Sequence, residues 1–104
     1  MRGKKTKALT AAEIDRRLRQ HKGLLLECHV KRIGLFGSHA RGSQKKNSDV
    51  DFLVEFRKPD FDDFMNLAFG LEKLLGRKVD LITESSLSAH LRPYVEKEIK
   101  WHEI

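Results

Sequence analysis

The chain has 104 residues, a formal net charge of +6 and a single cysteine, Cys28. This length favours one domain, and the lone cysteine excludes an internal disulfide. No apolar run approaches the roughly 20 residues that a membrane-spanning helix needs, and the basic start is not followed by the apolar segment of a secretory signal. We therefore expect a cytoplasmic protein that does not associate with a membrane.

The excess positive charge lies mostly at the start of the chain. Four basic side chains supply most of it: Arg2, Lys4, Lys5 and Lys7. We predict a basic flexible tail over residues 1–9 and one domain over residues 10–104. A contact with nucleic acid is one interpretation of the tail, and a solvated terminus is the other. We favour the solvated terminus and do not expect nucleic acid to be the partner.

The first predicted elements are a helix and a strand. Thr10 and Glu13 have the spacing of a capping box, which marks a helix start. Apolar residues then recur at helical intervals, which predicts one helix that ends near residues 27–29. Residues 30–36 are rich in residues that favour strands and end at Gly37, so they predict the first strand.

A second strand and a long helix are predicted next. Residues 38–42 can begin a short helix, residues 49–56 predict a strand, and Pro59 ends it. Asp60 or Asp62 is then expected to cap a helix. An apolar stripe at helical spacing supports this helix: Phe61, Phe64, Met65, Ala68, Leu71, Leu74 and Leu75.

The last third of the chain completes a mixed pattern of helices and strands. Gly76 suits the position just after the long helix, and residues 79–82 predict a third short strand. Residues 84–88 are expected to link this strand to a final helix that Pro93 opens and that continues to residue 100. The order predicts an α/β fold, with a small mixed sheet and helices packed on one face.

Two aspartates, Asp49 and Asp51, lie two residues apart on the predicted second strand. Side chains alternate along a strand, so both carboxylates share a face. Neighbouring carboxylates repel each other, which indicates either a bound cation or an open, hydrated surface. Mg²⁺ is commonly held by one or two carboxylates together with substrate phosphates. A pair of surface aspartates on an edge strand is the alternative.

The turn before these aspartates is equipped to hold phosphate. Gly37 allows a close approach of the backbone, and Ser38 offers a hydroxyl and an N–H group. Arg41 lies three residues further, on the same side of the short helix, and its planar guanidinium suits a phosphate group. A salt bridge from Arg41 to a surface acid is the alternative.

Asp80 lies in the middle of the apolar third strand, where aspartate is disfavoured. Such a residue needs a reason, and a functional carboxylate is one. The alternative is an aspartate at a strand end that pairs with Arg77 or Lys78.

Taken together, Gly37-Ser38, a spacer over residues 39–48 and Asp49-x-Asp51 resemble the nucleotidyltransferase superfamily related to DNA polymerase beta. Residues 30–42, 77–83 and 91–95 are similar to the minimal nucleotidyltransferases, called MNT domains. The resemblance runs from about residue 9 to the C-terminus and implies a nucleotidyltransferase-like fold.

The resemblance also implies roles for individual residues. Asp49, Asp51 and Asp80 would be the catalytic carboxylates and would hold two Mg²⁺ ions around the triphosphate of ATP. The nucleotide would be bound by Gly37, Ser38 and Arg41. Two ions on either side of the reacting phosphorus stabilise the attacking and the leaving oxygen.

In this family the partner is often a HEPN-domain toxin, which the MNT protein neutralises as its antitoxin by adding AMP to a tyrosine hydroxyl. We therefore expect transfer of AMP from ATP to a protein hydroxyl. One alternative is an antitoxin that acts by binding alone, and another is nucleotidyl transfer to a small molecule or to RNA. A homodimer is also compatible with a small α/β unit.

Overall fold

The computed structural model describes residues 9–58 and 60–104. The helices are α1 (Ala11–Gln20), α2 (Lys22–Glu27), α3 (Ser38–Arg41), α4 (Phe61–Leu75) and α5 (Arg92–Glu98), with a 3₁₀ turn, η1, at Glu84–Ser86. The strands are β1 (Val30–Phe36), β2 (Val50–Phe56), β3 (Val79–Thr83) and β4 (Lys100–His102). In these described ranges, no helix combines the length and the apolar character needed to cross a membrane.

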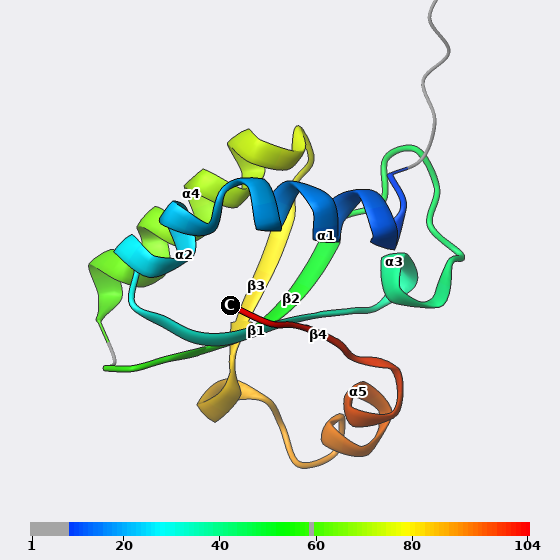
Figure 1. Ribbon diagram of the computed structural model, residues 1–104. Coiled ribbons are helices and arrows are strands. Elements are labelled where there is room, and N and C mark those ends of the chain that lie inside the picture. The colour runs from blue at the N-terminus through cyan, green and yellow to red at the C-terminus, as the bar shows by residue number, and fades with distance from the viewer. Residues whose placement is uncertain (1–8, 59) are drawn as a thin grey trace, which may run out of the picture.

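The strands form one mixed sheet in the order β3-β2-β1-β4 (Figure 1). β1 runs antiparallel to both β2 and β4, whereas β2 and β3 are parallel. The parallel pair needs a crossover connection, which α4 supplies. The predicted α/β class with a small mixed sheet is confirmed.

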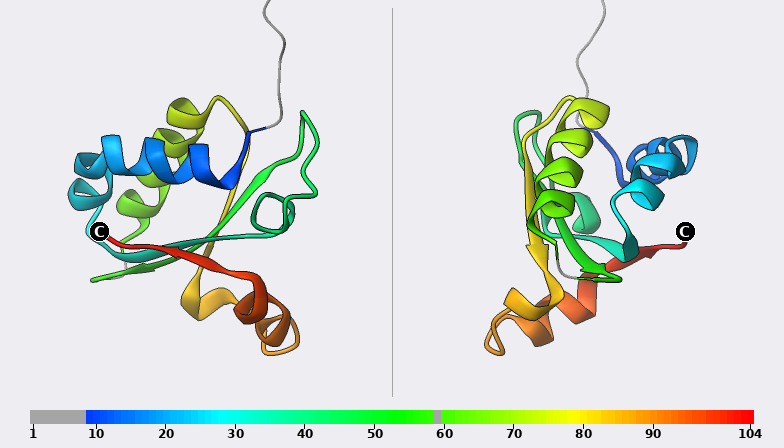
Figure 2. Two further views of the ribbon diagram at one scale, coloured as in Figure 1. Left: turned by 45° about the vertical axis from the view of Figure 1, so that its right-hand side comes forward. Right: turned by 90° about the vertical axis from the view of Figure 1, so that its left-hand side faces the viewer.

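Helices α1, α2 and α4 lie together on one face of the sheet (Figure 2). Along β2, Phe52 and Val54 point to that face and belong to the main core with the buried residues of these helices. Leu53 points the other way and packs with Leu87 and Val95 in a smaller apolar cluster. The predicted layer of helices on one face is confirmed, and α5 adds cover to part of the other face.

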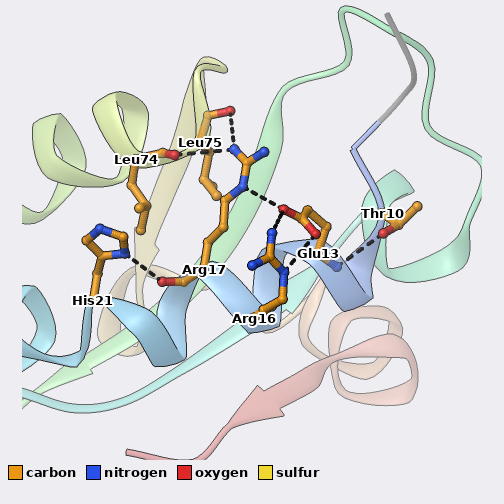
Figure 3. Close-up of polar contacts among 7 residues, drawn as sticks. All are labelled: Thr10, Glu13, Arg16, Arg17, His21, Leu74 and Leu75. Carbon is orange, nitrogen blue, oxygen red and sulfur yellow. Dashed lines mark hydrogen bonds and ion pairs between the residues drawn. The ribbon is translucent and has the colours of Figure 1, made fainter. Parts of the chain in front are cut away.

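The single N-terminal helix expected from the sequence is interrupted at His21, so that prediction is wrong. His21 has φ −123° and ψ 40°, outside the helical range, and separates α1 from α2. Its ring Nδ1 lies 3.0 Å from the carbonyl oxygen of Arg17 (Figure 3). The backbone N–H of His21 also donates to this carbonyl, at 3.1 Å, and to that of Leu18, at 3.2 Å, so the main chain and the side chain of His21 together close the end of α1.

Arg17 ties α1 to the C-terminal end of α4 (Figure 3). Its Nη1 donates to the carbonyl oxygens of Leu74 and Leu75 at 3.3 and 3.4 Å, and its Nε donates to Glu13 at 3.0 Å. The last carbonyls of a helix lack intrahelical partners, and a basic side chain satisfies them favourably. This contact fixes the helical layer that supports β2 and β3 from behind.

The predicted start of α1 and both predicted ends of α4 agree with the observed caps. The Thr10 hydroxyl accepts a bond from the Glu13 N–H, and Asp60, rather than Asp62, caps α4. Gly76 follows α4 with φ +66°, as expected for the position after a helix. The prediction for Pro59 lies outside the described residues, as does the predicted tail except for Leu9, which is buried in the core.

Strand β4 was not predicted, because the final helix was expected to continue to residue 100. The helix instead ends at Glu98, and β4 pairs with β1 beside Gly34. A Cβ atom at Gly34 would lie 2.6 Å from Ile99 Cδ1 and 2.9 Å from Trp101 Cε3, so the absent side chain makes room for this segment. The Arg32 guanidinium also lies 4.0 Å from the centre of the Trp101 ring.

Candidate active site

The strand register brings together residues that are far apart in the sequence. Asp51 and Asp80 are direct neighbours across the parallel pair β2 and β3. Phe36, the last residue of β1, is the neighbour of Asp51 across the antiparallel pair, so the Gly37 turn lies beside the same carboxylate. Asp49 comes immediately before β2. Three of the predicted site segments therefore meet at one end of the sheet.

Gly37 is required at its position for two reasons. Its φ of +78° belongs to the left-handed region that L side chains rarely adopt, and a Cβ atom would lie 2.2 Å from Oδ2 of Asp51. The sequence predicted that this glycine allows a close approach. The structure shows that the group approaching it within the chain is the Asp51 carboxylate.

Asp51 has an unusual environment for a carboxylate. Its pKa is raised to about 6, mainly by burial and then by the nearby negative charges of Asp80 and Asp49. The Arg41 guanidinium acts in the opposite sense, but does not offset these effects. The charged form of Asp51 is therefore disfavoured, and carboxylates with a perturbed pKa are common at functional sites.

The raised pKa of Asp51 predicts that the site lowers the stability of the metal-free fold at neutral pH. The ordinary pKa is 3.8, and the folded value is about 6. The favourable contribution of the protonated form is therefore complete below pH 3.8 and is lost as pH rises through about 6. In a chelator, Asp51→Asn should melt at a higher temperature than the unmodified chain near neutral pH, and this advantage should disappear near pH 3.5.

The exposed Glu103 provides a matched control for this experiment. Glu103→Gln also removes one negative charge, but outside the group of carboxylates around Asp51. It should show no pH-dependent gain in melting temperature. An equal melting temperature for Asp51→Asn and the unmodified chain at neutral pH would contradict the assigned charge stress at Asp51.

The carboxylates fit a divalent cation by their chemistry, although they do not form a ready-made cluster. Within the described part of the chain, no group of three or more His, Cys, Asp or Glu side chains is placed to hold a metal ion. Repulsion at Asp51 is the physical reason to expect a cation, because a positive charge would relieve it. The donors are carboxylate oxygens, which suit Mg²⁺ when phosphate oxygens complete its shell.

The short helix α3 begins at Ser38, as predicted. The N–H groups of Ala40 and Arg41 donate to the Gly37 carbonyl at 3.0 and 3.1 Å, which closes the first turn. Gly42 ends it with φ +79°. The turn and the helix therefore place Ser38 and Arg41 beside the carboxylates.

Arg41 forms the acidic contact that the sequence left open as an alternative. Its Nη1 donates to Oε1 of Glu98 at 2.9 Å, and the Gly37 N–H donates to Oε2 of the same carboxylate at 2.7 Å. Sequence reasoning missed Glu98, since nothing local distinguishes it from Glu96, the other acid of α5. A nucleotide-binding role for Arg41 stays a prediction.

His39 follows Ser38 directly, and its ring lies buried beside the backbone of Asp49. Its side chain is 1% exposed, and burial lowers its pKa, which favours the neutral imidazole. His39 is thus one of the two buried residues of α3, with Ala40.

Comparisons with known proteins agree with this geometry. Residues 12–102 match the family model described as a nucleotidyltransferase domain. Protein adenylyltransferase MntA from Thermococcus cleftensis is 44% identical over 93 residues, which cover 88% of this chain and 94% of the relative.

Two solved structures share the fold. One, described as a toxin–antitoxin with AMP-PNP, has a TM-score of 0.68 and 30% identity over 84% of this chain and 70% of that chain. The other is described as a tri-AMPylated HEPN toxin of Shewanella oneidensis in complex with an MNT antitoxin. It has a TM-score of 0.61 and 25% identity over 85% of this chain and 70% of that chain.

Proposed function

Because the chain belongs to the nucleotidyltransferase domain family, we propose that it transfers AMP from ATP to a hydroxyl group of a protein. The observation that carries the proposal is the meeting of Asp51 with both Asp80 and the Gly37 turn. Carboxylates on two neighbouring strands, next to a turn, provide the groups that bind a nucleoside triphosphate. The carboxylates can hold a cation, and the N–H groups of the turn can bind phosphate oxygens.

In this proposal the carboxylates Asp49, Asp51 and Asp80 hold Mg²⁺, which supplies positive charge to the triphosphate. Ser38 binds phosphate oxygens through its hydroxyl and backbone N–H groups, and Arg41 binds them through its guanidinium. These contacts orient the α-phosphorus for in-line attack.

The bond changes balance within the site. The acceptor oxygen forms a bond to the α-phosphorus, while the bond between that phosphorus and the bridging oxygen of the β-phosphate breaks. Pyrophosphate leaves with the bonding electrons. The proton of the acceptor hydroxyl passes to the Asp80 carboxylate, which is exposed on β3 and therefore open to an incoming side chain.

We further propose that the acceptor is a tyrosine of a HEPN-domain toxin, and that the chain acts as the antitoxin. Support comes from the relatives: one is named a protein adenylyltransferase, and one solved complex pairs an AMPylated HEPN toxin with an MNT antitoxin. The shallow position of the site suits a protein acceptor, since Asp49 and Asp80 are both exposed.

The test is to incubate the chain with Mg²⁺, ATP and a HEPN-domain partner protein, and to determine the masses of both proteins by intact mass spectrometry. The proposal predicts a mass increase of the partner in units of AMP, located on a tyrosine by peptide mapping. Asp49→Asn should abolish it. A stable complex without a mass change would instead favour an antitoxin that acts by binding alone. Transfer of AMP to a small molecule or to RNA, and not to the partner, would show that the acceptor is not a protein.

A further inference from the structure

The carboxylate of Glu98 occupies a position with the properties of an anion site. It accepts the Gly37 N–H at 2.7 Å through one oxygen and the Arg41 guanidinium at 2.9 Å through the other. These two donors belong to the turn and the short helix that the proposed function assigns to the nucleotide phosphates. One side chain from α5 therefore satisfies two phosphate-binding groups at once.

The charge around Glu98 makes this arrangement unfavourable once a nucleotide arrives. Asp49, Asp51 and Asp80 already gather negative charge at this end of the sheet, and the charge of Glu98 also acts on Asp51. An N–H group aligned with one acceptor cannot serve a phosphate oxygen in the same direction. A triphosphate and the observed Glu98 carboxylate thus compete for the same donors.

We propose that Glu98 sets the affinity of the site for nucleotide by acting as a resident anion that a phosphate group must displace from Gly37 and Arg41. This inference rests on the proposed function and deepens it. In the nucleotide-free protein Glu98 keeps the two donors satisfied, and on binding it moves aside so that they contact the β- or γ-phosphate.

The surrounding structure limits the displacement to the side chain. Glu98 is the last residue of α5, which is held to the sheet by the buried Val95, and β4 pairs with β1 directly afterwards. The backbone is therefore fixed on both sides of Glu98. The side chain is about one-fifth exposed, 21%, so a path toward solvent is open to it.

The experiment compares Glu98→Gln and Glu98→Ala with the unmodified chain by calorimetric titration of a non-hydrolysable ATP analogue with Mg²⁺. Removing a charged competitor for two donors should lower the Kd about tenfold in each variant. Adenosine, which has no phosphate, should bind equally to all of them.

Glu96→Gln is the matched control, because Glu96 lies on the same helix, is exposed and pairs with Arg92 rather than with the site. It removes the same charge and should change the Kd less than about twofold. The melting temperatures of all variants show whether they fold. If Glu98→Ala does not fold, the Kd of Glu98→Gln alone tests the proposal.

The outcomes separate this inference from the proposed function. If the unmodified chain binds the analogue and both Glu98 variants bind it equally or more weakly, Glu98 positions Arg41 rather than competing, and the inference is wrong while the nucleotide site stands. If a gain appears equally in Glu96→Gln, it reflects net charge alone, and the inference is wrong. If no folded variant and no unmodified chain binds the analogue, the proposed nucleotide site fails and the inference fails with it.

Discussion

Replacing Asp49 or Asp51 with asparagine should lower the rate of AMP transfer by at least about a thousandfold while the chain still folds. Asparagine keeps nearly the same shape but removes the negative charge that would hold a divalent cation against the triphosphate. Asp51 lies next to Asp80 across the parallel strands, and the charge of Asp49 also acts on Asp51. Each variant therefore removes one charge from the same group of carboxylates. The rate is measured as the increase of AMP on the partner in single-turnover reactions stopped at successive times.

The exposed Asp62 on α4 supplies the control, since Asp62→Asn is equally conservative and lies outside the site. It should transfer AMP at the unmodified rate. Burial and the neighbouring carboxylates disfavour the charged form of Asp51, so removing the charge should not unfold the chain. We therefore expect Asp51→Asn to be both folded and inactive. Transfer at more than about a tenth of the normal rate by both Asp49→Asn and Asp51→Asn would contradict the assigned mechanism.

Replacing Gly37 with alanine should reduce transfer about a hundredfold and also lower the stability of the fold. The new Cβ atom would meet Oδ2 of Asp51 at 2.2 Å, so the carboxylate must move away. A displacement of about 1 Å in a group that takes part in the chemistry is enough for such a loss. The backbone conformation, with φ +78° and ψ −156°, is nearly restricted to glycine and adds a destabilisation of about 1–3 kcal/mol.

Gly42 provides a control that separates these two effects. It also has a positive φ, +79°, although its ψ of +16° places it in the αL region, and a Cβ atom there meets nothing within 4 Å. Gly42→Ala should therefore lose about 1 kcal/mol of unfolding free energy and keep most of its activity. Stability is measured by chemical denaturation, and transfer by the mass assay. Equal activity losses in the two variants would show that the backbone conformation, and not the contact with Asp51, explains the effect.

The parts of this fold that local patterns determine could be predicted from the sequence. β1 and β2 follow from runs of strand-forming residues bounded by Gly37 and by a polar loop, and α4 follows from its apolar stripe between Asp60 and Gly76. Alternation along a strand also predicted a shared face for Asp49 and Asp51, whereas β2 begins only at Val50, after Asp49.

The features that depend on contacts between distant segments could not be predicted in the same way. Strand β4 forms because Gly34 leaves room for Ile99 and Trp101, and this room is visible only once β1 and β4 are paired. The contact of Glu98 with the Gly37 turn joins residues 61 positions apart and has no local signal. The break at His21 follows from its non-helical backbone conformation, which no local sequence pattern indicated.

The most direct test of the central claim is a crystal structure of the chain with Mn²⁺ in place of Mg²⁺ and a non-hydrolysable ATP analogue, with data collected at the manganese absorption edge. We expect anomalous density in contact with Asp49 and Asp51, and a triphosphate that lies against the Gly37–Ser38 turn. Nucleotide and manganese bound together elsewhere on the chain, with this end of the sheet empty, would contradict it.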